Sequence, residues 1–189
     1  MNNYKIVVAD SDSTSRKLIS ELLKKRGYNV YQAGDGGEAL RVSRRIYPHL
    51  VIMDINLLGI NGYKTAKIIE EDRISSVIFS ANNIDSAFYE KLKTMNIFAY
   101  IVKPINSEQL YQTVEFSINN IDKVNSLQEK IQHLENELVN RKKIDKAKGI
   151  VMEKLRVSEN EAYKYLRKKS MDYCISMDVL AEKIIKKYG

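Results

Sequence analysis

The sequence predicts an α/β fold in which helices cover both faces of a five-stranded parallel sheet, followed by a helical stalk and a three-helix bundle. Two features of the 189-residue chain predict this division. Up to residue 119, short apolar runs alternate with amphipathic stretches whose apolar residues recur every three or four positions. After residue 119, the strand-like apolar runs stop and only the helical spacing of apolar residues continues. We therefore expect a sheet domain at residues 1–120, a coiled-coil stalk at 121–140 and a helical domain at 141–189.

Five apolar runs are the candidate strands, at residues 6–9, 30–32, 50–53, 77–79 and 100–102. Glycines such as Gly27 and Gly59 mark turns between them. In a parallel sheet wound by helices, the loops at the carboxyl ends of the strands meet along one edge. Four polar residues end or follow candidate strands: Asp10, Asp54, Ser80 and Lys103. Two acids, a hydroxyl and an ammonium are therefore expected at this edge, where the acids can hold Mg²⁺ and the lysine can pair with a phosphoryl group.

A stretch of apolar residues spaced alternately by three and four positions predicts the stalk, namely Val124, Leu127, Ile131, Leu134 and Leu138. This short heptad seam favours a parallel homodimer, and the alternative is a helix packed on its own domain. No glycine or proline occurs at residues 106–148, so one continuous helix can join the two domains. Ser107 is the expected N-cap of the helix that leads into the seam.

The C-terminal helical domain carries the excess charge of the chain. Residues 141–189 contain 14 Lys and Arg against 7 Asp and Glu, whereas residues 1–140 contain 17 of each. Such a basic domain indicates a polyanionic partner, and the alternative is a solvated basic surface without a partner. Ser158 and Glu161 form a capping box for the second helix of this domain, and Ser176 is placed to cap the third.

Three strings in the first domain resemble the response-regulator receiver family, whose fold is flavodoxin-like: VIMDIN at residues 51–56, SA at 80–81 and AYIVKP at 99–104. The resemblance implies that Asp54 accepts a phosphoryl group from a sensor histidine kinase. It implies that Mg²⁺ is held by Asp10, Asp54 and the backbone carbonyl of Asn56. Ser80, Tyr100 and Lys103 would form the switch, and the bond between Lys103 and Pro104 would be cis.

Two residues depart from the receiver pattern. The family usually has two adjacent acids after the first strand, but here Ser11 follows Asp10. Serine brings no negative charge, so the affinity for Mg²⁺ should fall unless Asp12 turns into the site or Asp10 binds directly. Leu58 stands where the family commonly has proline.

Strings in the last 49 residues resemble the ANTAR domain, an RNA-binding module of antitermination regulators: AKGIVM at residues 147–152, LRKKSM at 166–171 and VLA at 179–181. The resemblance implies that a dimer binds hairpins in leader RNA and favours the antiterminated fold. Small and basic residues are the expected RNA contacts, namely Arg141, Lys142, Lys146, Ala147, Lys148, Gly149, Arg167 and Lys168. For Ala147 and Gly149 the alternative is packing within the helical domain.

Several alternatives stay open at this point. A DNA-binding regulator with a helix-turn-helix would have similar short helices and basic ends. A phosphorelay adaptor that binds only proteins would leave the basic face without a ligand. We expect no enzyme, since we find no nucleophile beside a base and no Gly-rich phosphate loop. We also expect a cytoplasmic protein without a membrane contact, because no apolar stretch approaches the roughly 20 residues of a membrane span. The single cysteine, Cys174, is expected to pack as a small side chain.

Overall fold

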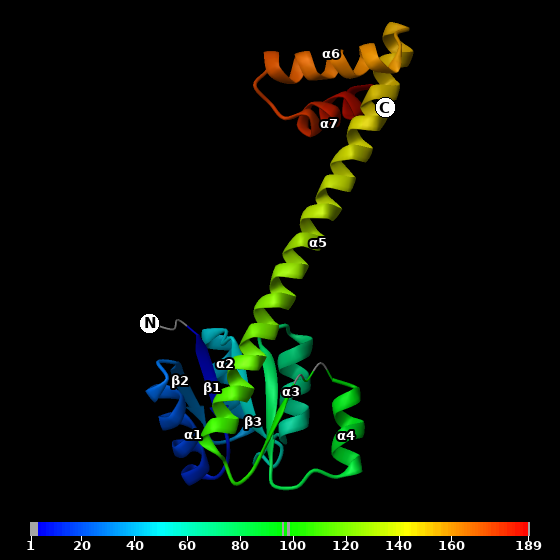
Figure 1. The fold of residues 1–189 in the computed structure, drawn as a ribbon. Coiled ribbons are helices and arrows are strands. Elements are labelled where there is room, and N and C mark those ends of the chain that lie inside the picture. Colours follow the sequence, from blue (N-terminus) through cyan, green and yellow to red (C-terminus); the bar gives the residue numbers. More distant parts are fainter. Residues whose placement is uncertain (1–3, 96, 98, 189) are drawn as a thin grey trace. The chain divides into compact units, whose positions relative to one another are not determined.

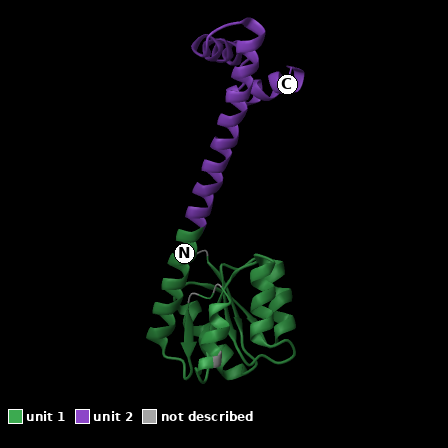
Figure 2. Cartoon of the chain, turned by 90° about the vertical axis from the view of Figure 1, so that its right-hand side faces the viewer, with its two compact units in different colours: residues 1–124 green, residues 125–189 purple. Residues whose placement is uncertain are grey.

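The computed structural model describes residues 4–95, 97 and 99–188, with the side chain of residue 87 left aside. The chain divides into two compact units, Met1–Val124 and Asn125–Gly189, which we call the first and second units. Figure 2 shows the two units in different colours. Each unit has its own buried apolar core, so each is described by itself.

The first unit is built on a five-stranded sheet in which all neighbouring strands are parallel, in the order β2-β1-β3-β4-β5. The strands are β1 (Lys5–Ala9), β2 (Asn29–Ala33), β3 (Leu50–Asp54), β4 (Ser76–Ala81) and β5 (Tyr100–Val102). All five predicted strands are confirmed, and four of them are longer than the apolar runs predict.

Helices cover both faces of this sheet (Figure 1). The helices of the first unit are α1 (Ser13–Lys25), α2 (Gly36–Ile46), α3 (Gly62–Glu71), α4 (Ser86–Lys93) and the start of α5 (Ser107–Leu155). Alternate strand residues belong to two separate cores: Val7 packs with residues of α2, α3 and α4, and Ile6 packs with residues of α1 and α5. Because both faces are covered, the central strands are apolar at nearly every position.

Polar residues fix where the helices of the first unit begin. Asp12, Asp35, Asn61 and Asp85 each accept a backbone N–H from the first turn of the following helix. Gly62, the first residue of α3, lies so close to the strand end that a Cβ would collide with the backbone oxygen of Asp54. A residue without a side chain therefore allows α3 to begin directly beside Asp54.

Helix α5 is a single helix of 49 residues that begins in the first unit and ends in the second. The continuous helix predicted across residues 106–148 is confirmed. Its predicted cap is wrong by one position, because the side chain of Asn106 accepts the N–H groups of Glu108 and Gln109, and Ser107 is already helical. The first unit also extends past residue 120, since Ile121 is buried in the core formed with α1.

The second unit packs the C-terminal turns of α5 against α6 (Glu159–Asp172) and α7 (Met177–Tyr188). Ala147 and Val151 of α5 share this core with Ala162 and Leu166 of α6 and with residues of α7. The predicted capping box is present, with Ser158 and Glu161 each accepting from the other's backbone N–H. The first of the three predicted helices is therefore the end of α5 and not a separate helix.

Among the described residues, no helix combines the length and apolar character needed to cross a bilayer. The peptide bond between Lys103 and Pro104 is cis, as the resemblance to receivers implies.

Candidate functional sites

The four polar residues predicted at the sheet edge do meet at the carboxyl ends of the strands. Asp54 is the last residue of β3 and pairs in register with Ser80 of β4. Asp10 directly follows β1, and Lys103 directly follows β5. The backbone of Lys103 is tied to this edge because its N–H donates to the carbonyl of Ala81 at 2.9 Å. The sheet topology thus brings together residues that are up to 93 positions apart in the chain.

The ammonium of Lys103 bridges the two carboxylates. Its Nζ lies 2.8 Å from Oδ2 of Asp10 and also pairs with Oδ2 of Asp54. The side chains of Lys103, Asp10 and Asp54 are only 13%, 2% and 9% exposed, so little water screens these pairs. Burial lowers the pKa of Lys103, but the hydrogen bonds to Asp10 and Asp54 outweigh it and hold this pKa above its ordinary value.

The remaining carboxylate oxygens are held by nearby backbone groups. Oδ1 of Asp10 accepts the N–H of Asp12 at 2.9 Å, and Oδ1 of Asp54 accepts the N–H of Asn56 at 2.6 Å. The guanidinium of Arg16 donates to the backbone carbonyl of Asp10. Asp12 itself does not face the pair, because its carboxylate caps α1 through the N–H of Thr14. A metal-binding role for Asp12 would therefore require it to leave this cap.

The donors at this edge are of the type that Mg²⁺ prefers. Two buried carboxylates, Asp10 and Asp54, share the ammonium of Lys103, and Asp54 also lies beside the backbone of Asn56. Hard divalent cations bind oxygen ligands of this kind. Within the described residues, no group of three or more His, Cys, Asp or Glu side chains is placed to hold a metal. These oxygen ligands therefore fit Mg²⁺, but they carry fewer negative charges than a site with a third acid would.

Ser11, which stands in place of that third acid, makes a different contact. Its Oγ accepts the backbone N–H of Leu58 at 2.9 Å, which links the loop after β1 to the loop after β3. The sequence marks both residues as departures from the receiver pattern. It does not predict that they contact each other, because they are 47 positions apart.

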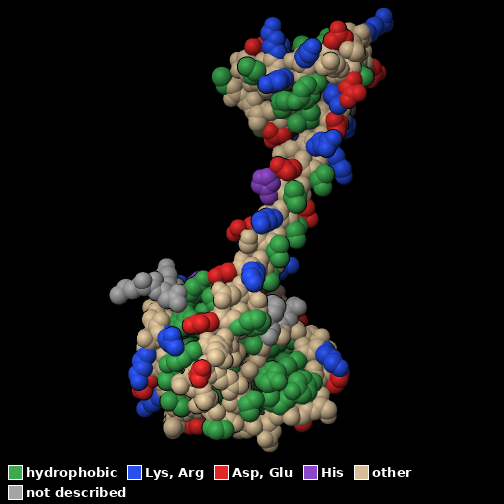
Figure 3. All heavy atoms as spheres, viewed as in Figure 1, with side chains coloured by type: hydrophobic (Ala, Val, Ile, Leu, Met, Phe, Trp, Pro, Cys, Tyr) green, Lys and Arg blue, Asp and Glu red, His purple; other side chains and the backbone are tan. Residues whose placement is uncertain are grey.

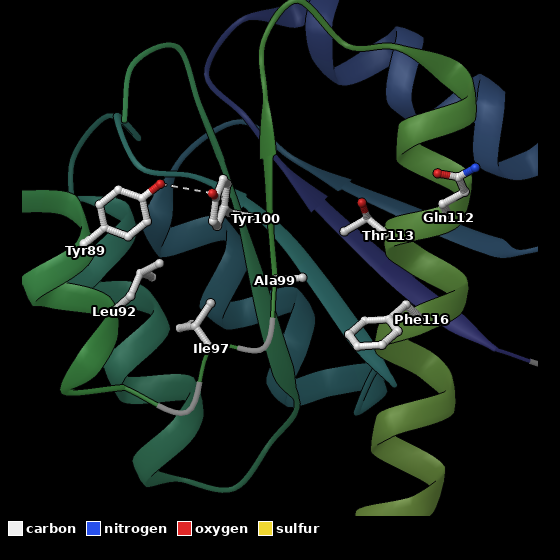
Figure 4. Close-up of a pocket in the computed structure, with 8 residues that line it drawn as sticks. All are labelled: Tyr89, Leu92, Ile97, Ala99, Tyr100, Gln112, Thr113 and Phe116. Atoms are coloured by element: carbon white, nitrogen blue, oxygen red, sulfur yellow. Dashed lines mark hydrogen bonds between the residues drawn. The ribbon is translucent and has the colours of Figure 1, made fainter. Parts of the chain in front are cut away.

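The two predicted switch residues lie at different depths. Ser80 is buried, and its hydroxyl has no hydrogen-bond partner among the described residues. Tyr100 is only partly buried and lies in an open groove of about 450 Å³ lined by α4, β5 and α5 (Figure 4). There its hydroxyl shares a hydrogen bond of 3.2 Å with the hydroxyl of Tyr89. This hydrogen bond is the largest cause of the raised pKa of Tyr100, and burial is the second. Sequence reasoning missed Tyr89, which has no motif of its own.

The basic side chains of the second unit fall into two groups. One group makes ion pairs within the unit: Lys143 with Glu182, Lys148 with Asp145 and Glu159, and Lys169 with Asp172. The other group is exposed and forms no ion pair among the described residues, and it includes five of the expected RNA contacts, namely Arg141, Lys142, Lys146, Arg167 and Lys168. We call these five residues the free cations.

The structure argues against two of the other expected RNA contacts and leaves the third open. Ala147 is 0% exposed in the core of the second unit, so its expected RNA contact is wrong and the packing alternative holds. Lys148 forms ion pairs with Glu159 at 2.7 Å and with Asp145 at 2.9 Å, and both contacts raise its pKa. Gly149 faces open space, because beyond its chain neighbours and the nearby backbone of its own helix no described atom lies within 4 Å of the position that a Cβ would take.

The five seam residues of α5 lie on its surface, where Figure 3 shows exposed apolar side chains along the helix. Their exposed fractions range from 37% at Val124 to 58% at Leu134 and Leu138. The alternative that this stretch packs on its own domain is therefore wrong. Leu134 and Leu138 also line a groove of about 810 Å³ in the second unit, together with Ile144 and Tyr163.

Two family models match the chain. The response regulator receiver domain matches residues 6–115, and the ANTAR domain matches residues 132–185. A relative similar over nearly the whole length is the transcriptional regulatory protein PdtaR of Mycobacterium tuberculosis. It is 26% identical over 186 residues, which cover 98% of this chain and 91% of that protein.

Solved structures match the first unit. The N-terminal domain of a response regulator/sensory box/GGDEF protein from Carboxydothermus hydrogenoformans superposes with a TM-score of 0.58 and 30% identity, and the match covers 63% of this chain and 97% of that one. The chemotaxis response regulator CheY4 of Vibrio cholerae has a TM-score of 0.58 at 23% identity and shows the shared fold, covering 61% of this chain and 99% of that one.

Proposed function

Because the chain belongs to the two-component response regulators, with a receiver domain followed by an ANTAR domain, we propose that it binds hairpins of leader RNA and promotes transcription antitermination under the control of Asp54 phosphorylation. The single observation that supports the RNA part most is the set of five free cations on the ANTAR unit. The observation that supports the control part is the buried pocket formed by Asp10, Asp54 and Lys103.

The phosphoryl step uses the carboxylate of Asp54 as the nucleophile. A carboxylate oxygen attacks the phosphorus of a phosphohistidine on the sensor kinase, the P–N bond breaks and an acyl phosphate forms on Asp54. Lys103, already paired with this carboxylate, stays as a counter-charge for the new phosphoryl oxygens. Asp10, Asp54 and the carbonyl of Asn56 would hold Mg²⁺, which when bound neutralises charge on the phosphoryl group.

The switch then involves Ser80 and Tyr100. The hydroxyl of Ser80 is buried beside Asp54 and has no hydrogen-bond partner in the described part of the chain, so it can donate to a phosphoryl oxygen. Movement of Ser80 toward the phosphoryl group opens room behind it, and the ring of Tyr100 turns inward. Such a turn breaks the hydrogen bond to Tyr89 and changes the surface of α4 and β5. A mass increase of one phosphoryl group in the full chain, lost in Asp54→Asn, tests the phosphoryl acceptor.

RNA binding is assigned to the free cations and to the open surface at Gly149. Ammonium and guanidinium groups without an ion pair can bind phosphates without first breaking an ion pair within the protein. Unpaired loop bases need an accessible surface nearby that no large side chain covers. The paired residues Lys143 and Lys169 are less suited, because RNA would have to compete with Glu182 and Asp172.

A binding assay with neighbouring variants tests this assignment. A library of stem-loop RNAs with randomised loops is compared with a library of duplex DNA by gel shift of the full-length protein. We expect Lys142→Ala to weaken RNA binding severalfold, and Lys143→Ala, which removes a paired neighbour, to change it little. Tight binding to the DNA library alone would refute the proposal in favour of a DNA-binding regulator, and binding to neither would favour a protein-binding adaptor.

Dimerisation is assigned to the exposed seam of α5. Apolar residues spaced alternately by three and four positions fit a parallel pair of helices, and the five seam side chains are exposed. Light scattering with and without a phosphoryl donor should show a monomer shifting toward a dimer. We expect Leu134→Asp to abolish the dimer, whereas Val139→Asp, an exposed apolar position next to the seam, should retain it. An unchanged mass for demonstrably phosphorylated protein would contradict this role.

A further inference from the structure

The two departures from the receiver pattern in this chain are the two partners of one hydrogen bond. Ser11 Oγ accepts the backbone N–H of Leu58 at 2.9 Å. A proline at position 58 has no N–H and could not make this bond. The side chain of Leu58 is largely exposed, so residue 58 contributes to this contact through its backbone N–H.

This hydrogen bond joins the same two loops that a bound cation would join. Asp10 and Ser11 belong to the loop after β1, whereas Asp54 ends β3 and Leu58 lies in the loop that follows it. A divalent cation held by Asp10 and Asp54 would tie these loops together through charge. The contact between Ser11 and Leu58 ties them together without a cation, and it lies on the same rim of the sheet.

The charges at this edge of the sheet also favour weaker binding of a divalent cation. Two carboxylates, Asp10 and Asp54, are balanced in part by the ammonium of Lys103. An acid at position 11 would add a further negative charge and a further oxygen ligand, and Ser11 supplies a neutral hydroxyl that is already engaged as an acceptor. The attraction for a divalent cation is correspondingly smaller.

We propose that Ser11 is a positioning residue whose hydrogen bond to the backbone of Leu58 holds the two loops of the phosphorylation pocket together without a divalent cation, at the cost of weaker Mg²⁺ binding. The proposal rests on the pocket assigned above to phosphorylation. It predicts that the loops keep one arrangement whether or not Mg²⁺ is present. It also predicts that the two departures act as a pair.

The first test measures the hydrogen bond itself. In metal-free buffer, amide hydrogen exchange by NMR on the full chain should show the Leu58 N–H protected in the wild type. Ser11→Ala removes the acceptor and should speed this exchange about tenfold. The matched control is Leu58→Ala, which keeps the backbone donor and should leave residue 58 protected. An unchanged exchange rate in Ser11→Ala would refute the link between the loops.

The second test examines whether the two positions act as a pair. Leu58→Pro removes the donor while keeping the carbonyl of residue 58, which accepts the N–H of Gly36 at 3.3 Å. Ser11→Ala and Leu58→Pro should each shift the amide resonances of both loops, and the double variant should shift them no further than the larger single change. Additive shifts would contradict a shared hydrogen bond. Circular dichroism checks that each variant is folded, and Ser11→Ala alone carries the test if Leu58→Pro is not.

The third test measures the cation. Calorimetric titration with MgCl₂ should give a dissociation constant that falls roughly 10- to 100-fold in Ser11→Asp relative to the wild type. Dissociation constants within about twofold of each other would overturn the part of the proposal that concerns Mg²⁺. None of these measurements requires phosphoryl transfer or RNA, so their failure is distinct from a failure of the proposed function.

Discussion

Replacing Lys103 by methionine removes the cation that two buried carboxylates share. Methionine keeps much of the length and apolar character of the lysine side chain, so the change is largely one of charge. Without the ammonium, Asp10 and Asp54 lose their common partner at the carboxyl end of the sheet. We expect Lys103→Met to destabilise the first unit in metal-free buffer at neutral pH.

The size of this effect follows from the burial of the three side chains. Removing one partner of a fully buried ion pair costs about 3–5 kcal/mol because a charge is left without compensation. Lys103 remains partly accessible at the rim, and each carboxylate keeps one backbone N–H, so we expect about 3 kcal/mol. For a unit of this size that corresponds to a fall in melting temperature of roughly 10 °C.

Calorimetry of the full-length variant measures the melting temperature, and amide exchange by mass spectrometry shows which unit is affected. The matched control is Lys93→Met, because Lys93 pairs with Glu90 at 2.6 Å while both side chains are about 70% exposed. Such a surface pair contributes under about 1 kcal/mol, so this control should melt close to the wild type. If Lys103→Met lost no more stability than Lys93→Met, the buried charge argument would be wrong.

Three further changes test other parts of the structure. The pKa of Lys103 is raised in the folded state, so its contribution to stability is complete below the unfolded value of about 10.4 and is lost as pH rises through the folded value. The difference in unfolding free energy between wild type and Lys103→Met should thus be constant near neutral pH and become smaller in alkaline buffer. A difference that became larger in alkaline buffer would contradict a raised pKa of Lys103 in the folded state. Leu166→Ala, in the core of the second unit, should cost about 3 kcal/mol in urea unfolding, and a loss below about 1 kcal/mol would refute its central place. Gly149→Ala should stabilise the second unit by about 0.5–1 kcal/mol in the same assay, because the added methyl group meets open space within a helix, and a destabilised variant would show that this surface is covered.

The sheet and its polar edge could be predicted because both depend on local pattern. Apolar runs and helical spacing define the strands and helices, and a parallel topology then requires Asp10, Asp54, Ser80 and Lys103 to meet. The heptad spacing also predicts an apolar seam for a parallel dimer along α5; the structure leaves these side chains exposed, and the dimer itself stays a prediction.

Contacts that depend on how elements pack could not be predicted in this way. The pairing of Lys148 with Glu159 requires the end of α5 to meet the start of α6, and no spacing in one helix reveals it. Ala147 looks like a small surface residue within its motif, but only the packing of three helices places it in the core. The contact between Tyr89 and Tyr100 depends on the distance between α4 and β5.

The number of unpaired cations in the second unit that contact an RNA determines how many ions the RNA would displace. Residues 141–189 contain 14 Lys and Arg, and a count of charges alone would forecast a correspondingly steep dependence of affinity on salt. A phosphate displaces condensed cations from the nucleic acid only where the protein supplies a positive charge that is not already neutralised. If the five free cations make the contacts, the logarithm of the association constant should fall with the logarithm of salt concentration at a slope of about −3.5 to −4.5 per chain.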